Sequence, residues 1–164
     1  MTTVTHERVI MPRPLDAAAF APYGQVLEAP RNGLREDYAG RLESGDPTLR
    51  ANLALVRAKP RTLPLRVEAM ERHNWSSQAF LPLAASRYLV LTCPSRADSS
   101  PDLERLQAFL CRGDQGINYD RGTWHHPMTA LDAPATFAMF MWDELGARDT
   151  EWATIAEPVV IADG

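Results

Sequence analysis

The chain has 164 residues, of which 45% are hydrophobic and 23% are charged, and its formal net charge is −4. This length and composition predict one soluble globular domain spanning residues 1–164. The acidic balance leaves no basic footprint for nucleic acid, and the lack of an apolar run of about 18 residues predicts no membrane span. We therefore expect neither nucleic acid nor a membrane as a partner.

The two cysteines, Cys93 and Cys111, form no CxxC motif and no multi-bridge framework. The first residues of the chain also lack the apolar core of a signal peptide. Reduced thiols and a cytoplasmic location are therefore expected.

Thirteen prolines and nine glycines divide the chain into many short elements, which favours a β-rich fold over a helical bundle. Residues 14–24 predict a short helix with Asp16 as its N-cap, and residues 25–27 predict an edge strand. Residues 28–48 are polar and predict a long surface loop. The first quarter of the chain thus contributes one helix and one strand to the fold.

Residues 51–60 alternate between apolar and polar side chains and predict a strand. Leu53 and Leu55 share a face with Arg57 and Lys59. If the leucines face the core, the two cations on the same face lie at the mouth of a cavity. The alternative is an amphipathic strand end that runs into solvent.

The second half of the chain predicts further strands. Residues 87–93 and 136–142 are apolar, strand-like runs, and residues 151–155 predict a short final strand. A short helix is predicted to begin at Ser100, with Pro101 at its first position. Residues 107–111 fit either a helix or a strand. The regular spacing of short elements predicts an all-β fold with a few short helices, either a sandwich or a barrel. A double-stranded β-helix (jelly-roll barrel) of the cupin type satisfies this pattern, and its interior suits one small ligand.

The most chemically dense stretch is 113–127, with the sequence GDQGINYDRGTWHHP. It predicts two short strands around a turn at residues 120–122. Alternation sends His125 to one face of the second strand, and Trp124 and His126 to the other. The pattern alone does not decide which histidine faces the interior.

A second dense stretch begins at residue 71. Alternation there places Glu71 and His73 on one face of a strand and Arg72 on the other.

These two stretches resemble the signature motifs of the ureidoglycolate lyase family, formerly called ureidoglycolate hydrolases. The matching segments are Glu71-Arg72-His73 with Ser77-Gln78-Ala79-Phe80-x-Pro82, and Gln115-Gly116-x-Asn118-Tyr119-x-x-x-x-Trp124-His125-His126-Pro127. The resemblance covers nearly the whole chain, although residues 142–146 depart from the usual pattern. It implies a cupin barrel, usually a homodimer, that splits the small-molecule substrate ureidoglycolate into glyoxylate and urea in allantoin (purine) breakdown.

The cupin register implied by the resemblance selects His125 as the histidine that faces the cavity. It also places His73 and Gln78 where a metal-binding cupin carries a histidine and a glutamate, and Glu71 where it carries another histidine. Because a neutral glutamine is a weaker ligand than a carboxylate, no firmly required cofactor is expected. A loosely bound divalent metal such as nickel, held by His73, His125 and Glu71, remains compatible with the motifs.

Cleavage of ureidoglycolate needs a base, an acid and a cation that holds the carboxylate. His73 and His125 are predicted as acid and base, with Tyr119 assisting proton transfer. Gln78 and Asn118 are predicted to hydrogen-bond the ureido group. The carboxylate is assigned to Arg72 or Arg57, together with Lys59, although parity keeps Arg72 outside the barrel unless a bulge or a partner subunit intervenes.

Two other functions stay open on the sequence. One is an amidohydrolase that releases ammonia from the same substrate, and the other is a non-catalytic cupin that binds a small carboxylate. Hydrolysis would require a firm metal or a carboxylate base to activate water, and Gln78 argues against both. His126 and Trp124 are expected to be structural.

Overall fold

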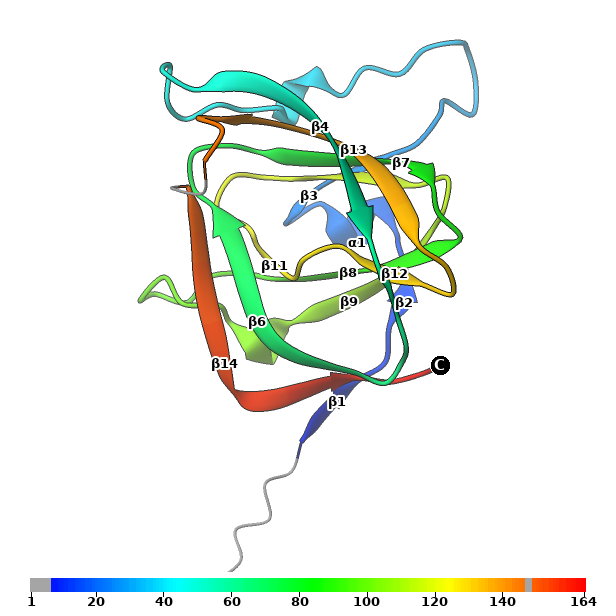
Figure 1. Ribbon diagram of the computed structural model, residues 1–164, viewed down its shortest axis with the longest axis vertical. Coiled ribbons are helices and arrows are strands. Elements are labelled where there is room, and N and C mark those ends of the chain that lie inside the picture. Colours follow the sequence, from blue (N-terminus) through cyan, green and yellow to red (C-terminus); the bar gives the residue numbers. More distant parts are fainter. Residues whose placement is uncertain (1–6, 147–148) are drawn as a thin grey trace, which may run out of the picture.

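The computed structural model describes residues 7–146 and 149–164, which form two curved β-sheets facing one another (Figure 1). The predicted all-β fold is confirmed, because the described residues contain a single four-residue α-helix. No helix in these residues is long and apolar enough to cross a membrane.

The larger sheet, sheet A, has nine strands in the order β1-β14-β6-β11-β8-β12-β5, with β9 beside β8 and β2 beside β9. Its members are β1 (Arg8–Ile10), β2 (Arg13–Pro14), β5 (Pro60–Arg61), β6 (Leu65–His73), β8 (Arg87–Cys93), β9 (Gln107–Arg112), β11 (Trp124–His125), β12 (Thr129–Leu131) and β14 (Thr150–Ile161).

The smaller sheet, sheet B, has five strands in the order β3-β10-β7-β13-β4. They are β3 (Gly24–Leu27), β4 (Arg50–Ala58), β7 (Gln78–Ala84), β10 (Gly116–Tyr119) and β13 (Ala135–Asp143). The helices are α1 (Ala17–Phe20) and the 3-10 turns η1 (Ala39–Arg41) and η2 (Leu103–Arg105).

Strand β8 divides the core into two clusters. Tyr88 and Val90 pack with Phe80 and Phe137 in the cluster between the sheets. Its alternate residues, Leu89, Leu91 and Cys93, belong to a second cluster on the other face of sheet A. Both faces of β8 are therefore buried, which explains why the sequence there is a continuous apolar run.

Helix α1 begins as the sequence predicts. The Asp16 carboxylate accepts a hydrogen bond of 2.9 Å from the backbone N–H of Ala19, the bond expected of an N-cap. The helix ends at Phe20, whose ring is fully buried against sheets A and B. Four helical residues are enough to place this ring in the core.

The expectation that Leu53 and Leu55 of β4 face the core is wrong. Leu53 and Leu55 are 70% and 71% exposed, whereas the small residues Val56 and Ala58 on the other face pack against the core. Alternation divides the side chains of a strand between two faces, but it does not indicate which face is buried. The packing of β4 at the edge of sheet B decides which face points inward.

Two other predictions are corrected in the second half of the chain. Residues 100–106 form only the 3-10 turn η2 in place of an α-helix, and the ambiguous segment after it is strand β9, paired with β8. The final strand β14 runs to Ile161, well beyond its predicted end, because it pairs along most of β6 with a register shift between Thr154 and Val159.

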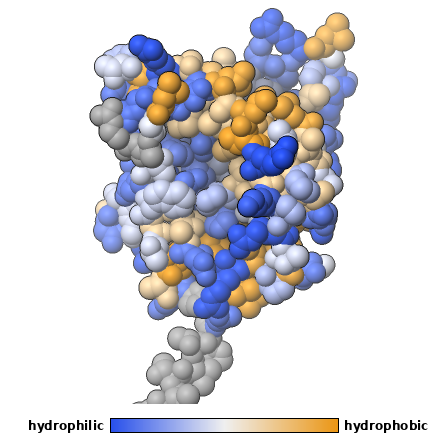
Figure 2. All heavy atoms as spheres, in the orientation of Figure 1, coloured by the Kyte–Doolittle hydropathy of each residue, from blue (hydrophilic) through white to orange (hydrophobic). Residues whose placement is uncertain are grey.

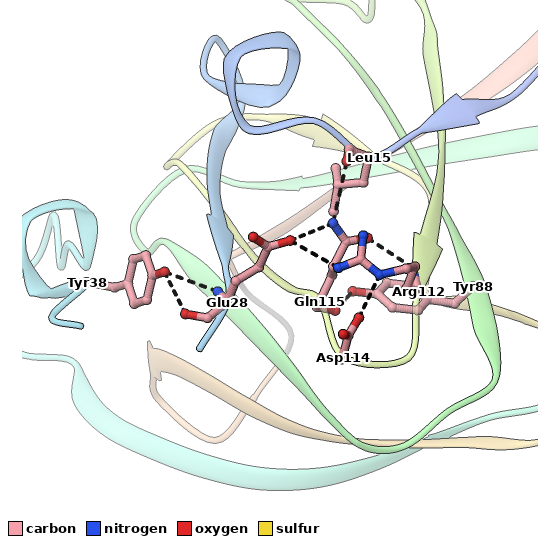
Figure 3. Close-up of polar contacts among 7 residues, drawn as sticks. All are labelled: Leu15, Glu28, Tyr38, Tyr88, Arg112, Asp114 and Gln115. Carbon is pink, nitrogen blue, oxygen red and sulfur yellow. Dashed lines mark hydrogen bonds and ion pairs between the residues drawn. The ribbon is translucent and has the colours of Figure 1, made fainter. Parts of the chain in front are cut away.

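The Gln115 side chain ties the long loop after β3 to the β9–β10 turn (Figure 3). Its amide nitrogen donates to the Glu28 carboxylate at 2.7 Å, and its amide oxygen accepts from the Arg112 backbone N–H at 3.0 Å. The Tyr88 hydroxyl donates to the Gln115 carbonyl. The Tyr38 hydroxyl bonds both the N–H and the carbonyl of Glu28. This glutamine of the second motif is therefore a structural residue.

Candidate functional site

Strands β6 and β11 bring residues of the two motifs together. The two strands are antiparallel neighbours, and His125 lies directly opposite Glu71. His125 Nε2 is 3.5 Å from Glu71 Oε1. The alternation predicted for both stretches is confirmed here, because both side chains lie on the face of sheet A turned toward sheet B.

His73 completes a cluster of three. Its ring centroid is 5.5 Å from that of His125, and the ligand atoms of Glu71, His73 and His125 all lie within 4.8 Å of one another. Both histidines are buried. The three residues named from the sequence as a metal-binding set are thus a cluster in space, and the set could hold a divalent ion.

A cavity of about 250 Å³ lies between the sheets beside this cluster. Glu71 and Gln78 line its polar side, Arg57 lines it from β4, and apolar side chains such as Phe80 and Met139 complete the wall. Pockets for drug-sized ligands measure roughly 300–1,000 Å³, so this one suits a smaller molecule.

The proton of His125 lies on Nδ1, because that nitrogen is 2.9 Å from the Thr123 carbonyl oxygen, which can only accept. The other nitrogen, Nε2, consequently carries a lone pair toward Glu71. Burial tends to raise the pKa of Glu71, but its interaction with the neighbouring imidazoles, that of His125 first and that of His73 next, holds the pKa below its usual value. A carboxylate and an imidazole lone pair that face one another favour a cation between them, either a proton or a metal ion.

His73 is neutral at physiological pH. Burial, assisted by the neighbouring His125, lowers the pKa of His73 to about 4. Its Nδ1 lies 3.4 Å from the Thr150 hydroxyl at the start of β14. A neutral imidazole can bind a metal ion or donate a hydrogen bond, but it is not a proton donor of the imidazolium type near pH 7.

Several buried polar atoms at the site have no hydrogen-bond partner within residues 7–146 and 149–164. They include His73 Nε2, His125 Nε2 and Gln78 Oε1. Buried polar atoms without partners are uncommon in folded proteins. Three of them beside one cavity indicate a ligand site.

Arg72 does not lie in this site. Its Nε donates to the Glu151 carboxylate at 2.8 Å, and its guanidinium lies 4.6 Å from the centre of the Trp124 ring. Arg72 therefore does not bind substrate in the cavity of its own subunit, because alternation along β6 turns this side chain to the outer face, as its parity in the sequence predicts. Trp124 is buried in the second cluster, as expected for a structural residue.

Asn118 also lies outside the cavity. It faces away from Tyr119 on β10, and its amide donates to the Arg41 carbonyl at 3.0 Å and to Gln25 Oε1 at 3.3 Å. Asn118 holds the η1 turn against the outer face of sheet B, so its predicted contact with the ureido group is corrected. The register of β10 with β7 puts Tyr119 beside Gln78 on the inner face.

The two predicted cations of β4 separate. Both side chains are exposed, but Arg57 is among the residues that line the cavity, whereas Lys59, beyond the end of the strand, is not. The predicted role of Lys59 at the cavity mouth is corrected. His126 Nδ1 donates to the Pro127 carbonyl at 2.9 Å, which agrees with a structural role.

Sequence reasoning missed two partners that orient the histidines. The Thr123 carbonyl is a backbone group that carries no side-chain signal, and Thr150 lies 77 residues from His73 along the chain. Only the pairing of β14 with β6 brings Thr150 to the site. A larger groove of about 530 Å³ lies on the outer face of sheet B, away from the histidines, and its lining is mainly apolar.

Comparisons with known proteins identify the family of the chain. The family model described as ureidoglycolate lyase matches residues 7–162. A ureidoglycolate lyase of Rhizobium leguminosarum bv. trifolii is 38% identical over 143 residues, which cover 82% of this chain and 84% of that protein. A ureidoglycolate lyase of Brucella melitensis biotype 2 is 37% identical over 145 residues, 83% of each chain.

Among solved structures, a dTDP sugar isomerase from Desulfovibrio desulfuricans G20 has a TM-score of 0.50 at 18% identity, over 79% of this chain and 81% of that one. This likeness concerns the fold alone, and it confirms the predicted cupin-type barrel. The family match and the relatives extend over most of the chain, and the residues matched by the family model span both motifs. The chain therefore belongs to the ureidoglycolate lyase family and is a carbon–nitrogen lyase.

Proposed function

We propose that this protein cleaves ureidoglycolate into glyoxylate and urea at the cavity between the sheets, and that it serves allantoin breakdown in the cytoplasm. The observation that carries the proposal is the 3.5 Å separation between His125 Nε2 and the carboxylate of Glu71, which lines a cavity suited to a small acid.

The reaction transfers one proton within the substrate. The hydroxyl group loses its proton, its oxygen lone pair forms the carbonyl of glyoxylate, and the carbon–nitrogen bond breaks. The electrons of that bond pass to the ureido nitrogen, which takes up a proton and leaves as urea. One base that later acts as an acid is enough to balance the step.

His125 is the residue that we assign to this proton. Its Nδ1–H is held by the Thr123 carbonyl, so its Nε2 is free to accept the hydroxyl proton. The Glu71 carboxylate, 3.5 Å from the same nitrogen, then stabilises the imidazolium that forms by its negative charge. The imidazolium returns the proton to the departing nitrogen.

His73 and Gln78 bind and orient the substrate in this proposal. With a pKa of about 4, His73 acts as a neutral hydrogen-bonding group and not as the acid partner of His125. The Gln78 amide oxygen is buried and free to accept from the N–H groups of the ureido moiety. Tyr119 has a buried hydroxyl and a pKa well above its usual value because of desolvation, which disfavours proton transfer by this residue.

Arg57 is the cation that we assign to the substrate carboxylate. It is the one cationic side chain among the residues that line the described part of the cavity. A guanidinium binds both oxygens of a carboxylate in a fixed geometry. Its position at the mouth leaves the reacting carbon free to point inward, toward Glu71 and His125.

The residues of the site also fit a metal ion. Glu71, His73 and His125 supply a carboxylate and two imidazoles within 4.8 Å, and both Nε2 atoms lack other partners in the described chain. A loosely held divalent metal such as nickel would act there as a Lewis acid toward substrate oxygen. Gln78 in place of an anionic ligand is consistent with weak binding.

We also propose a homodimer formed through the outer face of sheet B. Leu53, Leu55 and Leu81 are 70%, 71% and 48% exposed, and they occupy one face of β4 and β7. Figure 2, which shares the orientation of Figure 1, shows hydrophobic residues gathered over the region where β4 and β13 lie. A contiguous apolar patch of this kind is typical of a protein interface.

The proposed reaction is tested by incubating the protein with ureidoglycolate and measuring urea, glyoxylate and ammonia. A reaction without enzyme corrects for spontaneous decay, and parallel samples with a chelator report on the metal. Urea and glyoxylate in equal amounts are expected. Ammonia in place of urea would indicate an amidohydrolase, and binding without any product would indicate a carrier of small carboxylates.

A further inference from the structure

The imidazole of His125 is stacked on the phenol ring of Tyr119. The ring centroids are 4.1 Å apart and the planes differ by 13°, the geometry of a parallel stack. The Nδ1 hydrogen bond to Thr123 fixes the rotation of the imidazole within its own plane, but it does not fix the plane itself. The flat contact with Tyr119 supplies this second constraint.

Tyr119 is in turn held by aromatic residues of the core. Its ring centroid is 6.0 Å from that of Phe20 and 6.4 Å from that of Phe80, which it meets nearly edge-on. Phe20 packs edge-on against Phe109 at 5.7 Å. A column of rings therefore runs from Phe109 through Phe20 and Tyr119 to His125, and it connects helix α1 to the active site.

The backbone of Tyr119 is equally constrained. Strand β10 lies between β3 and β7, and Tyr119 is opposite Gly24 on one side and Gln78 on the other. A Cβ atom at Gly24 would approach the Asn118 carbonyl oxygen to 1.8 Å, so only glycine permits this close pairing. The ring of Tyr119 thus has little freedom to move away from His125.

The hydroxyl group of Tyr119 takes no part in the contacts that hold the ring. It is buried, and it forms no hydrogen bond with any residue that the structure describes. The ring alone makes the contacts with His125, Phe20 and Phe80.

We propose that Tyr119 is a positioning residue, whose ring, supported by Phe20 and Phe80, sets the plane of the His125 imidazole so that Nε2 points at Glu71 and the substrate. The expected effect on kcat rests on the proposed function, whereas the stack of the two rings is a property of the free protein. A small misplacement of a reacting group can cost about 100-fold in rate.

The test compares Tyr119→Phe, which keeps the ring, with Tyr119→Leu and Tyr119→Met, which remove it. Tyr119→Phe is expected to keep kcat within about twofold, and the two aliphatic variants to lower kcat by about 100-fold with little change in KM. Two aliphatic variants are used so that one folded sample remains if the other fails to fold.

A matched control separates positioning from stability. Phe137 is fully buried in the same cluster but contacts Phe80 and Tyr88 in place of the histidine. Phe137→Leu is expected to lower the melting temperature as Tyr119→Leu does, while kcat stays near that of the unchanged protein. Equal loss of kcat in Phe137→Leu would overturn the positioning role.

An NMR measurement keeps the inference independent of the reaction. A ring stacked at 4.1 Å shifts the carbon-bound imidazole protons of His125 upfield, so this shift is expected in Tyr119→Phe and absent from the aliphatic variants. The proposal fails if Tyr119→Phe is as inactive as Tyr119→Leu, if Tyr119→Leu retains full kcat, or if the shift survives without the ring. A lack of urea production by the unchanged protein would instead count against the proposed function alone.

Discussion

His125 and Glu71 lie directly opposite each other on the antiparallel strands β11 and β6, with His125 Nε2 3.5 Å from Glu71 Oε1. The Thr123 carbonyl holds the far side of the imidazole. A histidine fixed between a carbonyl and a carboxylate has its free lone pair at a defined position, as a general base requires.

Replacement of His125 by alanine should lower kcat by about 10²- to 10⁴-fold, the usual contribution of a general base. The neighbouring His126→Ala is the control, because His126 bonds to Pro127 on the other side of the strand. Steady-state assays of urea release measure both variants. Similar kcat values for the two variants would contradict the role given to His125.

The stability of the free protein should fall as the pH drops from 6.5 toward 4. The unfolded His73 takes up a proton near its ordinary pKa of 6.5, while the folded residue does so only near 4. Below pH 6.5 the unfolded state therefore binds more protons, and folding loses up to about 3 kcal/mol from this residue.

Guanidinium unfolding of the metal-free protein at several pH values measures this loss. The His73→Gln variant should show a flatter dependence in the same window. Some slope should remain, because burial also lowers the pKa of His126. An identical slope in the two proteins would show that His73 does not titrate in this way.

Replacement of Arg57 by methionine should raise KM by roughly 10- to 100-fold with a smaller change in kcat, because a charge-assisted bond to the substrate carboxylate is lost. Arg72→Met serves as the matched control. It removes the ion pair with Glu151 and the contact with Trp124, so it should affect stability more than KM. A higher KM in Arg72→Met than in Arg57→Met would reverse the assignment.

Nickel should raise the melting temperature of the unchanged protein, since a ligand that binds only the folded state stabilises it. Glu71→Gln should reduce this shift by removing the one anionic ligand of the cluster. Glu68→Gln, at an exposed carboxylate of the same strand, should leave it unchanged. Calorimetric titration checks the affinity, and equal binding by both variants would exclude Glu71 as a ligand.

Introduction of a charge on the outer face of sheet B should separate the proposed dimer. Leu53→Glu and Leu55→Glu are expected to sediment as monomers at concentrations where the unchanged protein is a dimer. Leu34→Glu, at a fully exposed leucine of the long loop, is the control and should remain dimeric. Sedimentation velocity measures the oligomeric state of each protein, and a monomeric unchanged protein would refute the proposed dimer.

Much of the site could be predicted from the sequence, because strands alternate with a period of two. The shared face of Glu71 and His73, and the opposite faces of His125 and Trp124, follow from this period alone. The apolar run of β8 also predicts a strand, since a strand buried on both faces needs no polar residues.

Alternation does not indicate which of the two faces of a strand points inward, and the wrong predictions for β4 and β10 have this cause. Leu53 and Leu55 share the exposed face of β4, and Asn118 lies on the outer face of β10 because Tyr119 occupies the inner one. The choice depends on which sheet packs against each strand, and that involves residues far away along the chain.

The sequence by itself determined the β-rich fold class, the family, and the set Glu71, His73 and His125, because short-range periodicity and motif spacing are local properties. The tertiary structure alone decided that His125 faces Glu71, that Tyr119 stacks on His125, and that Asn118 lies outside the cavity. These relationships arise from the pairing of strands distant in sequence, and their register is fixed only when both sheets have packed around one core.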